Sequence, residues 1–130
     1  MFENRRTVAL AALLMFGGCG GPKHVPAAAS AKAALESALA AWRDGKPVGA
    51  IEGTKPTTQA EDFEWRAKKK LTAFEIVGEE SGQPEGAPRR FNVTLTIDAA
   101  PPVDAVYVVF GNDPVWVYRD KDYQTQFSKM

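Results

Sequence analysis

Residues 90–98 read RFNVTLTID, and after the first residue apolar side chains alternate with polar ones. Because successive side chains of a β-strand point to opposite faces, this alternation predicts a strand with one apolar and one polar face. Residues 71–79 (LTAFEIVGE) predict a second strand. The Gly/Pro-rich segment SGQPEGAP, residues 81–88, lies between them. The two strands are therefore expected to form an antiparallel hairpin.

A register that places the apolar side chains of both strands on one shared face also fixes which residues oppose each other. The pairs expected from it are Phe74 with Leu95, Ile76 with Val93, and Glu79 with Arg90. The last pair joins opposite charges and would favour the same register.

A second hairpin is predicted from residues 105–110 (AVYVVF) and 115–118 (VWVY), around the turn sequence GNDP. Both of its faces are apolar. One face carries Tyr107, Val109, Val115 and Val117, and the other carries Val106, Val108, Phe110, Trp116 and Tyr118. A sheet that packs a helix on one side usually leaves its other side polar. The second face is therefore either covered by another segment or exposed, and Phe110, Trp116 and Tyr118 form a candidate contact surface.

One amphipathic helix is predicted ahead of the strands, from Ser30 as N-cap to Asp44, with Gly45 at the position where helices commonly end. Leu35, Leu39 and Trp42 follow one another at spacings of four and three residues and form an apolar stripe. The stripe must pack against another element, and the predicted sheet is the partner that the chain offers.

The segment between this helix and the first hairpin, residues 46–70, has a less regular pattern. Pro and Gly interrupt it, and residues 57–60 predict a short edge strand. Residues 61–70 carry charges of both signs, with the acidic residues ahead of a basic run at 66–70. Such a run is typical of a solvated surface, although near a membrane it could also contact anionic head groups.

These elements predict an α+β domain in which one N-terminal helix packs on a curved antiparallel sheet of about four strands. The layout resembles that of cystatin-like and NTF2-like folds. The resemblance implies an alternative function, a small-molecule-binding or enzymatic pocket between helix and sheet. In that case Asp62 and Glu64, near Trp65, are carboxylates that would serve as acid and base, although no spacing singles them out.

The first 19 residues, MFENRRTVALAALLMFGGC, have the three parts of a signal peptide. Arg5 and Arg6 make a positive start, residues 8–16 form an unbroken apolar run, and small residues follow. The run is too short for a membrane span, which needs about 20 residues. A buried N-terminal helix is the alternative, and the arginine pair before the run and the glycines after it argue against that alternative.

The end of this segment, Phe16-Gly17-Gly18-Cys19, resembles the lipobox of bacterial lipoproteins, with Phe16 where Leu is usual. The resemblance implies cleavage between Gly18 and Cys19, a diacylglyceryl group on the Cys19 thiol, and acylation of the new amino terminus. It also implies a location in the bacterial cell envelope, at the outer membrane facing the periplasm if the cell is Gram-negative. An ordinary secreted protein with a free cysteine is the alternative.

The chain of 130 residues thus has three predicted parts. These are a signal peptide at 1–18, the lipidated Cys with a flexible tether at 19–29, and a single α+β domain at 30–125. The 16 basic and 16 acidic residues balance, so a dedicated nucleic-acid-binding surface is not expected. The chain has one Cys, the predicted anchor, and one His, in the tether, which excludes a zinc site built from Cys and His.

The sequence of the domain carries no glycine-rich phosphate loop and no nucleophile elbow, and the only Cys and His precede it. We therefore expect a membrane-anchored envelope lipoprotein that is not an enzyme and acts as a binding or structural module, without a metal or cofactor. Its expected partners are the membrane, through the lipid, and an envelope protein rather than a nucleic acid.

Overall fold

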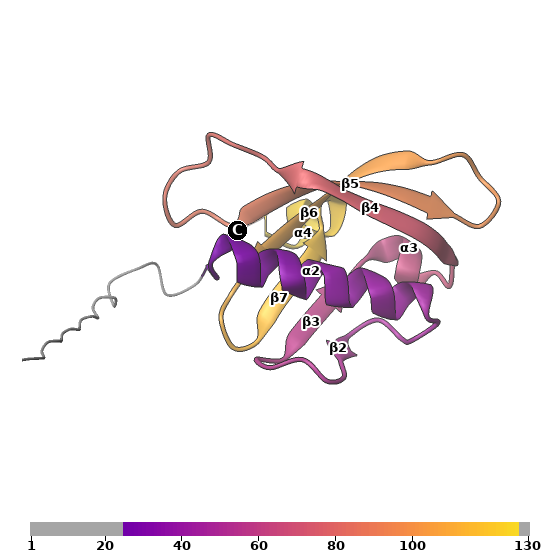
Figure 1. Cartoon of the computed structure of the whole chain (residues 1–130), viewed down its shortest axis with the longest axis horizontal. Coiled ribbons are helices and arrows are strands. Elements are labelled where there is room, and N and C mark those ends of the chain that lie inside the picture. The colour runs from indigo at the N-terminus through magenta and orange to yellow at the C-terminus, as the bar shows by residue number, and fades with distance from the viewer. Residues whose placement is uncertain (1–24, 128–130) are drawn as a thin grey trace, which may run out of the picture.

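The computed structural model describes residues 25–127 (Figure 1). The predicted signal peptide, its cleavage site at Gly18 and Cys19, and the first part of the predicted tether lie outside these residues. The elements are α2 (Ala28–Arg43), β2 (Ala50–Ile51), β3 (Thr58–Glu61), α3 (Phe63–Arg66), β4 (Leu71–Glu79), β5 (Arg89–Ile97), β6 (Val103–Phe110), β7 (Val115–Arg119) and α4 (Asp120–Phe127).

The strands form one curled sheet in the order β2-β3-β7-β6-β5-β4, and α2 packs against it. The predicted α+β class, with one helix packed on a curved sheet, is confirmed. The predicted number of about four strands is wrong, because six strands are present. The sheet is also mixed rather than antiparallel, since β3 pairs parallel with β7.

The predicted edge strand at 57–60 corresponds to β3, and it does not lie at an edge. It pairs with β2 on one side and with β7 on the other. A parallel pair needs a long connection between its strands, and here the chain between β3 and β7 contains the whole β4–β5–β6 meander. Local alternation identifies a strand but does not reveal a neighbour so far along the chain.

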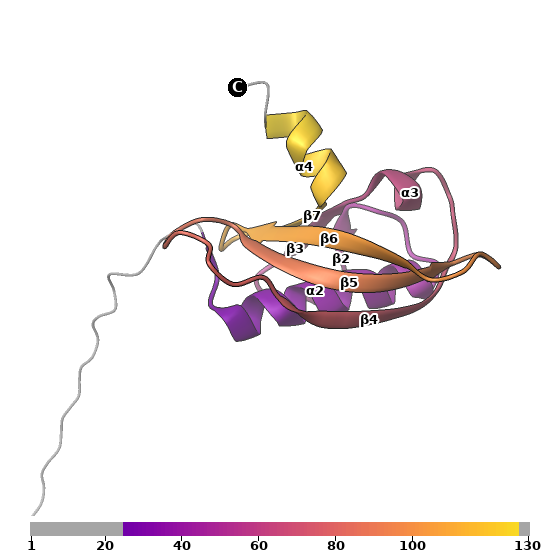
Figure 2. The ribbon, with the colours of Figure 1, turned by 90° about the horizontal axis from the view of Figure 1, so that it is seen from above.

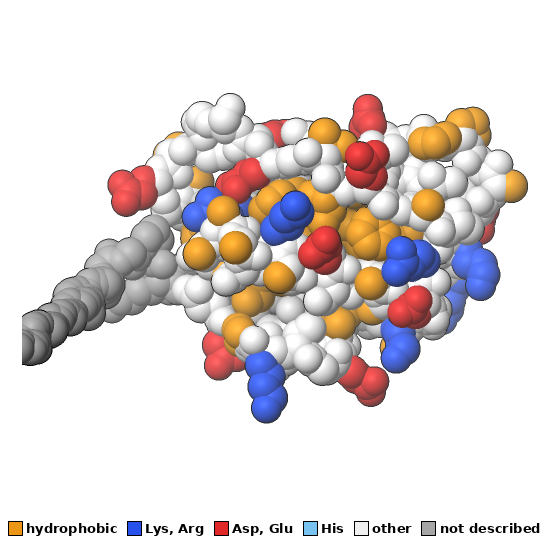
Figure 3. Space-filling model, in the orientation of Figure 1, with side chains coloured by type: hydrophobic (Ala, Val, Ile, Leu, Met, Phe, Trp, Pro, Cys, Tyr) orange, Lys and Arg blue, Asp and Glu red, His pale blue; other side chains and the backbone are white. Residues whose placement is uncertain are grey.

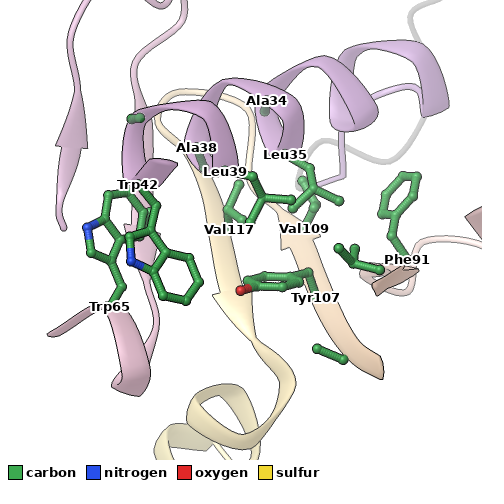
Figure 4. Close-up of a cluster of buried hydrophobic side chains, with 14 of the residues drawn as sticks. Ala34, Leu35, Ala38, Leu39, Trp42, Trp65, Phe91, Tyr107, Val109 and Val117 are labelled. Atoms are coloured by element: carbon green, nitrogen blue, oxygen red, sulfur yellow. The ribbon is translucent and has the colours of Figure 1, made fainter. Parts of the chain in front are cut away.

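The sheet has a helix on each face: α2 lies on one side and α4 on the other (Figure 2). The core fills the space between α2 and the sheet, with the apolar stripe of α2 facing strand residues such as Val109 and Val117 (Figure 4). Leu35 and Leu39 are almost completely buried there. The stripe therefore packs on the sheet, as its spacing predicts.

Helix α2 begins at Ala28, two residues before the predicted N-cap, and its actual N-cap, Ala27, makes no side-chain hydrogen bond. The preceding Pro26 is buried, and its carbonyl accepts a hydrogen bond of 2.7 Å from Arg89 Nε. The last residues of the predicted tether thus pack with the domain. At the other end, Gly45 adopts a positive φ of 83° directly after the helix, as predicted for a terminating glycine.

The register of the β4–β5 hairpin is confirmed at Phe74–Leu95 and Ile76–Val93. The predicted pair of Glu79 and Arg90 is wrong, because the register shifts between Ile76 and Gly78 and places Glu79 opposite Phe91. An irregularity of this kind inserts a residue into one strand and displaces all later pairs. The charges still find partners: Glu79 pairs with Arg89 at 2.9 Å, and Glu80 pairs with Arg90 at 3.1 Å.

The two faces of the β6–β7 hairpin divide as predicted. On the α2 side, the main core contains Tyr107, Val109, Val115 and Val117. On the other side, Val108 is fully buried but lies outside that core. Helix α4 provides the cover, because it contacts both β6 and β7 on this outer face. Of the two possibilities that the sequence left open, the structure shows a face that is covered in part by α4.

Candidate functional site

The ends of β3 and β7 lie beside the middle of β6 on the α2 side of the sheet and bring together three polar residues that are distant in sequence. The last parallel pair of β3 and β7 is Glu61–Tyr118, so Asp62 and Arg119 follow it side by side. On the other side of β7, Tyr107 of β6 is the register partner of Arg119. The register alone therefore places the side chains of Asp62, Tyr107 and Arg119 at one point of the buried face.

These side chains form a closed hydrogen-bonded network. The Tyr107 hydroxyl donates to Asp62 Oδ2, and Arg119 Nη1 lies 3.2 Å from Asp62 Oδ1. Arg119 Nη2 donates to Glu64 Oε1 at 2.7 Å. Asp62 is also the N-cap of α3 and accepts from the backbone N–H groups of Glu64 and Trp65. Aromatic rings flank the guanidinium, which lies 5.0 Å from the centroid of Phe63.

Asp62 is only 1% exposed, so this carboxyl lies inside the domain and is not a solvated loop charge. Burial raises the pKa of the Asp62 carboxyl, although hydrogen bonds from Tyr107 and backbone N–H groups and the charge of Arg119 act in the opposite direction. Burial also raises the pKa of Tyr107 well above its ordinary range, and the negative charge of Asp62 adds to this. The tyrosine is therefore a neutral donor to the carboxylate.

The structure brings Asp62 and Glu64 together through Arg119, with Asp62 inside the packed domain and Glu64 partly exposed beside Lys69. A buried acid surrounded by its own donors is held in one geometry and has no side open to a substrate. Hollows of about 370, 530 and 690 Å³ lie elsewhere, two along α2 and one within the loop that joins β4 to β5. None of these hollows is lined by Asp62, Glu64 or Trp65.

A stacked pair of tryptophans beside this network was not predicted from the sequence. The indole rings of Trp42 and Trp65 stack, with centroids 5.7 Å apart and planes 11° apart (Figure 4). Trp42 Nε1 donates to the carbonyl of Lys69, and Trp65 Nε1 donates to the carbonyl of Lys46, both at 2.8 Å. Each tryptophan lies near the end of its own helix and is hydrogen-bonded to the segment that follows the other helix.

A repeated sequence marks this arrangement. Residues 42–46 read WRDGK and residues 65–69 read WRAKK, so the pattern W-R-x-x-K occurs twice. Both copies end a helix with the same pair of bonds: Lys46 N to Ala41 O and Gly45 N to Trp42 O in the first, and Lys69 N to Glu64 O and Lys68 N to Trp65 O in the second. This is the Schellman motif. The repeat is visible in the sequence and was the available signal.

The basic run at 66–70 lies on the surface, and part of it has acidic partners. Arg66 pairs with Glu61 at 3.2 Å and with Asp122 at 2.8 Å, and Lys69 lies 3.7 Å from Glu64. On the face that carries α2, acidic side chains lie among the basic ones (Figure 3). Within residues 25–127, no three His, Cys, Asp or Glu side chains are grouped as metal ligands would be.

The predicted contact residues come together on the outer face of the sheet. Phe110 and Tyr118 lie with ring centroids 5.5 Å apart, and Trp116 lies 6.0 Å from Tyr118. Two rings of α4, Tyr123 and Phe127, complete the group. We call Phe110, Tyr118, Tyr123 and Phe127 the aromatic box. The contribution of α4 was not foreseen, because the polar segment that forms it shows little apolar periodicity.

None of the helices formed by residues 25–127 is both long and apolar enough to cross a bilayer. The chain matches no protein-family model, no curated protein and no solved structure.

Proposed function

We propose that the domain is a non-enzymatic binding module of the bacterial cell envelope, held at the membrane by a lipid on Cys19, and that it contacts a protein partner through the outer aromatic face. The observation that carries this proposal is the aromatic box together with the half-buried Trp116 beside it. Aromatic side chains provide large contact areas at small entropic cost and are enriched in protein interfaces.

The buried polar network supports a role without catalysis. A catalytic acid or base must reach its substrate, directly or through one water molecule. Asp62 instead accepts hydrogen bonds from Tyr107, Arg119 and the first turn of α3. Leu35, Leu39 and Leu95 fill the centre of the interface between α2 and the sheet. The alternative of a pocket in this interface is therefore confined to the two hollows at its edge, one beside β2 and one beside β3.

The position of Pro26 limits how far from the bilayer the domain would lie if Cys19 carries a lipid. This buried proline lies seven positions after Cys19. At about 3.3–3.6 Å per extended residue, a lipid on Cys19 would hold the domain within roughly 25 Å of the bilayer. A partner in the same membrane, or close to it, would then be within reach of the aromatic face.

Site-specific cross-linking in the native envelope tests the contact. A photoreactive phenylalanine analogue replaces Trp116 in one variant and Val77 in a matched control, since Val77 is 64% exposed and lies on β4, the edge strand farthest from α4 among the last four strands. We expect a discrete cross-linked product from position 116 that is missing from position 77. The same products from both positions, or none from position 116 in a folded and correctly located chain, would reject the contact.

Metabolic labelling with a fatty acid tests the anchor separately. Wild type is expected to incorporate the label, and the Cys19→Ala variant is expected to lose it. Equal labelling of the two chains would reject lipid attachment at Cys19 and leave the contact proposal untouched.

A further inference from the structure

Helix α4 lies on the outside of the domain and contributes no residue to its core. It has eight residues, follows β7 without an intervening loop, and none of its eight residues is buried. Helices of this length are not stable in water on their own. The position of α4 therefore depends on the face on which it lies.

The apolar part of that contact has a regular geometry. Tyr123 and Phe127 are four residues apart and lie on the same side of α4. Each of them contacts both strand aromatics: Phe110 lies 5.5 Å from Tyr123 and 5.8 Å from Phe127, and Tyr118 lies 6.2 Å and 5.7 Å from the same rings. The strand pair thus receives two aromatic side chains at i and i+4 of a helix.

The polar part of the contact lies at the start of α4. Asp120 pairs with Arg90 of β5 at 2.9 Å, and Asp122 pairs with Arg66 of α3 at 2.8 Å. Asp122 also accepts a hydrogen bond of 2.8 Å from the backbone N–H of Phe63. Two arginines of the domain therefore receive acidic residues in the first turn of the helix.

Beneath α4 the sheet is apolar. Val108, which points to this outer face, is 0% exposed although it lies outside the main core. This face carries two aromatic rings, a buried valine and two flanking arginines. It fits an amphipathic helix better than an extended strand, because the two residues that contact its rings, Tyr123 and Phe127, have the i, i+4 spacing of a helix.

We propose that the outer face of β6 and β7 is a receptor for a short amphipathic helix with acidic residues in its first turn and aromatic residues at i and i+4, and that α4 occupies it in cis. The partner of the proposed function carries such a helix and replaces α4 when it binds. This inference rests on the proposed function and assigns the chemistry of the partner segment.

The cis arrangement sets the strength of the interaction. A segment joined directly to the receptor has a high effective concentration, so a free helix competes poorly while α4 stays in place. Weakening the hold of α4 must therefore strengthen binding in trans. This coupling is the measurable signature of an occupant that can be replaced.

The test uses a fluorescent peptide of residues 120–130 (DKDYQTQFSKM) and the purified full chain, with binding followed by fluorescence anisotropy. We expect the Tyr123→Ala/Phe127→Ala chain to bind the peptide at least about tenfold more tightly than wild type, a difference of about 1.4 kcal/mol. The matched control, Gln126→Ala, changes an exposed position of α4 and is expected to bind like wild type. A peptide with alanine at both aromatic positions is expected to lose binding.

A milder variant keeps the test decisive if the double alanine chain does not fold. Asp122→Asn keeps the apolar contacts of α4 and weakens its pairing with Arg66, so it is expected to increase peptide binding by a smaller factor. Equal affinity of all folded chains, or equal affinity for the aromatic and alanine peptides, overturns the inference. A stable dimer of the wild-type chain with α4 exchanged between copies, seen by sedimentation, overturns the assignment to a partner and identifies a second copy as the occupant.

The outcome is separable from that of the proposed function. Peptide binding without a cross-link from position 116 would reject the envelope contact and keep the receptor. A cross-link from position 116 without peptide binding would reject only the helical receptor.

Discussion

Helices α2 and α3 end in the same way but begin in different ways. Both end at a W-R-x-x-K sequence and with the same two backbone hydrogen bonds. In both, the indole N–H donates to a backbone carbonyl just beyond the end of the other helix. α2 has 16 residues, seven of them buried, and its N-cap Ala27 offers no side-chain acceptor. α3 has four residues, of which only Trp65 is buried, and two carboxylates bind its first N–H groups.

The difference shows what each helix depends on. A long helix with an apolar stripe gains its stability from packing, so the absence of a capping side chain is tolerated. A single turn has too little packing of its own, and it exists here because distant groups fix its ends. Asp62 caps it from the buried network, Asp122 caps it from α4, and Trp42 holds the chain that leaves it.

Removing the buried cap should have the largest effect. Asp62→Ala removes one of the two carboxylates that bind Arg119, leaves the buried Tyr107 hydroxyl without its acceptor and frees two N–H groups of α3. We therefore expect the free energy of unfolding to fall by about 3–5 kcal/mol. Denaturant unfolding followed by tryptophan fluorescence measures it. The control is Glu61→Ala, which removes an exposed partner of Arg66 and should cost at most about 1 kcal/mol. Similar losses for the two variants would show that α3 does not depend on the buried network.

The reciprocal tryptophans should respond equally. Trp42→Phe and Trp65→Phe each keep an aromatic ring but remove one indole hydrogen bond to a part-buried carbonyl, and we expect each to cost about 1–3 kcal/mol. The double variant should cost less than the sum, because both rings belong to one stack. Additive losses in the same denaturant experiment would mean that the two helix ends are independent.

Substitutions at the left-handed residue of the two Schellman motifs should change the free energy of unfolding in opposite directions. Gly45→Ala puts a side chain at φ 83°, and because nothing lies within 4 Å of the new Cβ, the expected loss of about 1 kcal/mol comes from the backbone alone. Lys68 occupies the equivalent position at φ 71°, so Lys68→Gly should stabilise the domain by up to about 1 kcal/mol. Thermal unfolding of both variants checks the signs, and a destabilising Lys68→Gly would reveal a contact of this side chain that outweighs its backbone strain.

The pH dependence of stability should carry the smallest effect. Burial raises the pKa of Asp62 above its ordinary value of 3.8 in the folded state. Between the two pKa values the folded protein binds more protons than the unfolded chain, so this group makes the free energy of unfolding fall as the pH rises. Relative to Asp62→Asn, the wild type should therefore lose stability as the pH increases above 3.8.

Unfolding curves across acidic pH values measure this difference, and Glu75→Gln, which changes an exposed carboxyl of β4, is the control. A relative gain of the wild type with rising pH would mean that Arg119 and Tyr107 outweigh burial at Asp62.

Features of this fold that depend on residues close together in the chain can be predicted from the sequence, whereas features that depend on distant residues cannot. The register of the β4–β5 hairpin is readable from alternation at Phe74–Leu95 and Ile76–Val93, because the two strands are close in the chain and share one apolar face. The register shift that follows Ile76 is not readable in this way. The buried Asp62 is not readable from its neighbours, since it stands in a charged segment and its partners Tyr107 and Arg119 lie 45 and 57 residues away. Only the pairing of β3 with β7 brings them together. The repeat of W-R-x-x-K was readable, and it marks the contact between the two helix ends.

The place of β3 in the sheet has a consequence for how the chain is made. β4 to β7 form a meander in which each strand pairs with the next one to be synthesised, whereas β3 must wait for β7, whose pairing residues lie 57 positions later. Long-range pairing of this kind slows folding, because a large loop must close before its contacts form. During synthesis from the N-terminus, the apolar stripe of α2 cannot complete its packing on the sheet, and Asp62 cannot meet Arg119, until the last strand emerges. Biogenesis of the sheet is therefore completed by β7, and a chain interrupted before β7 would leave both contacts incomplete.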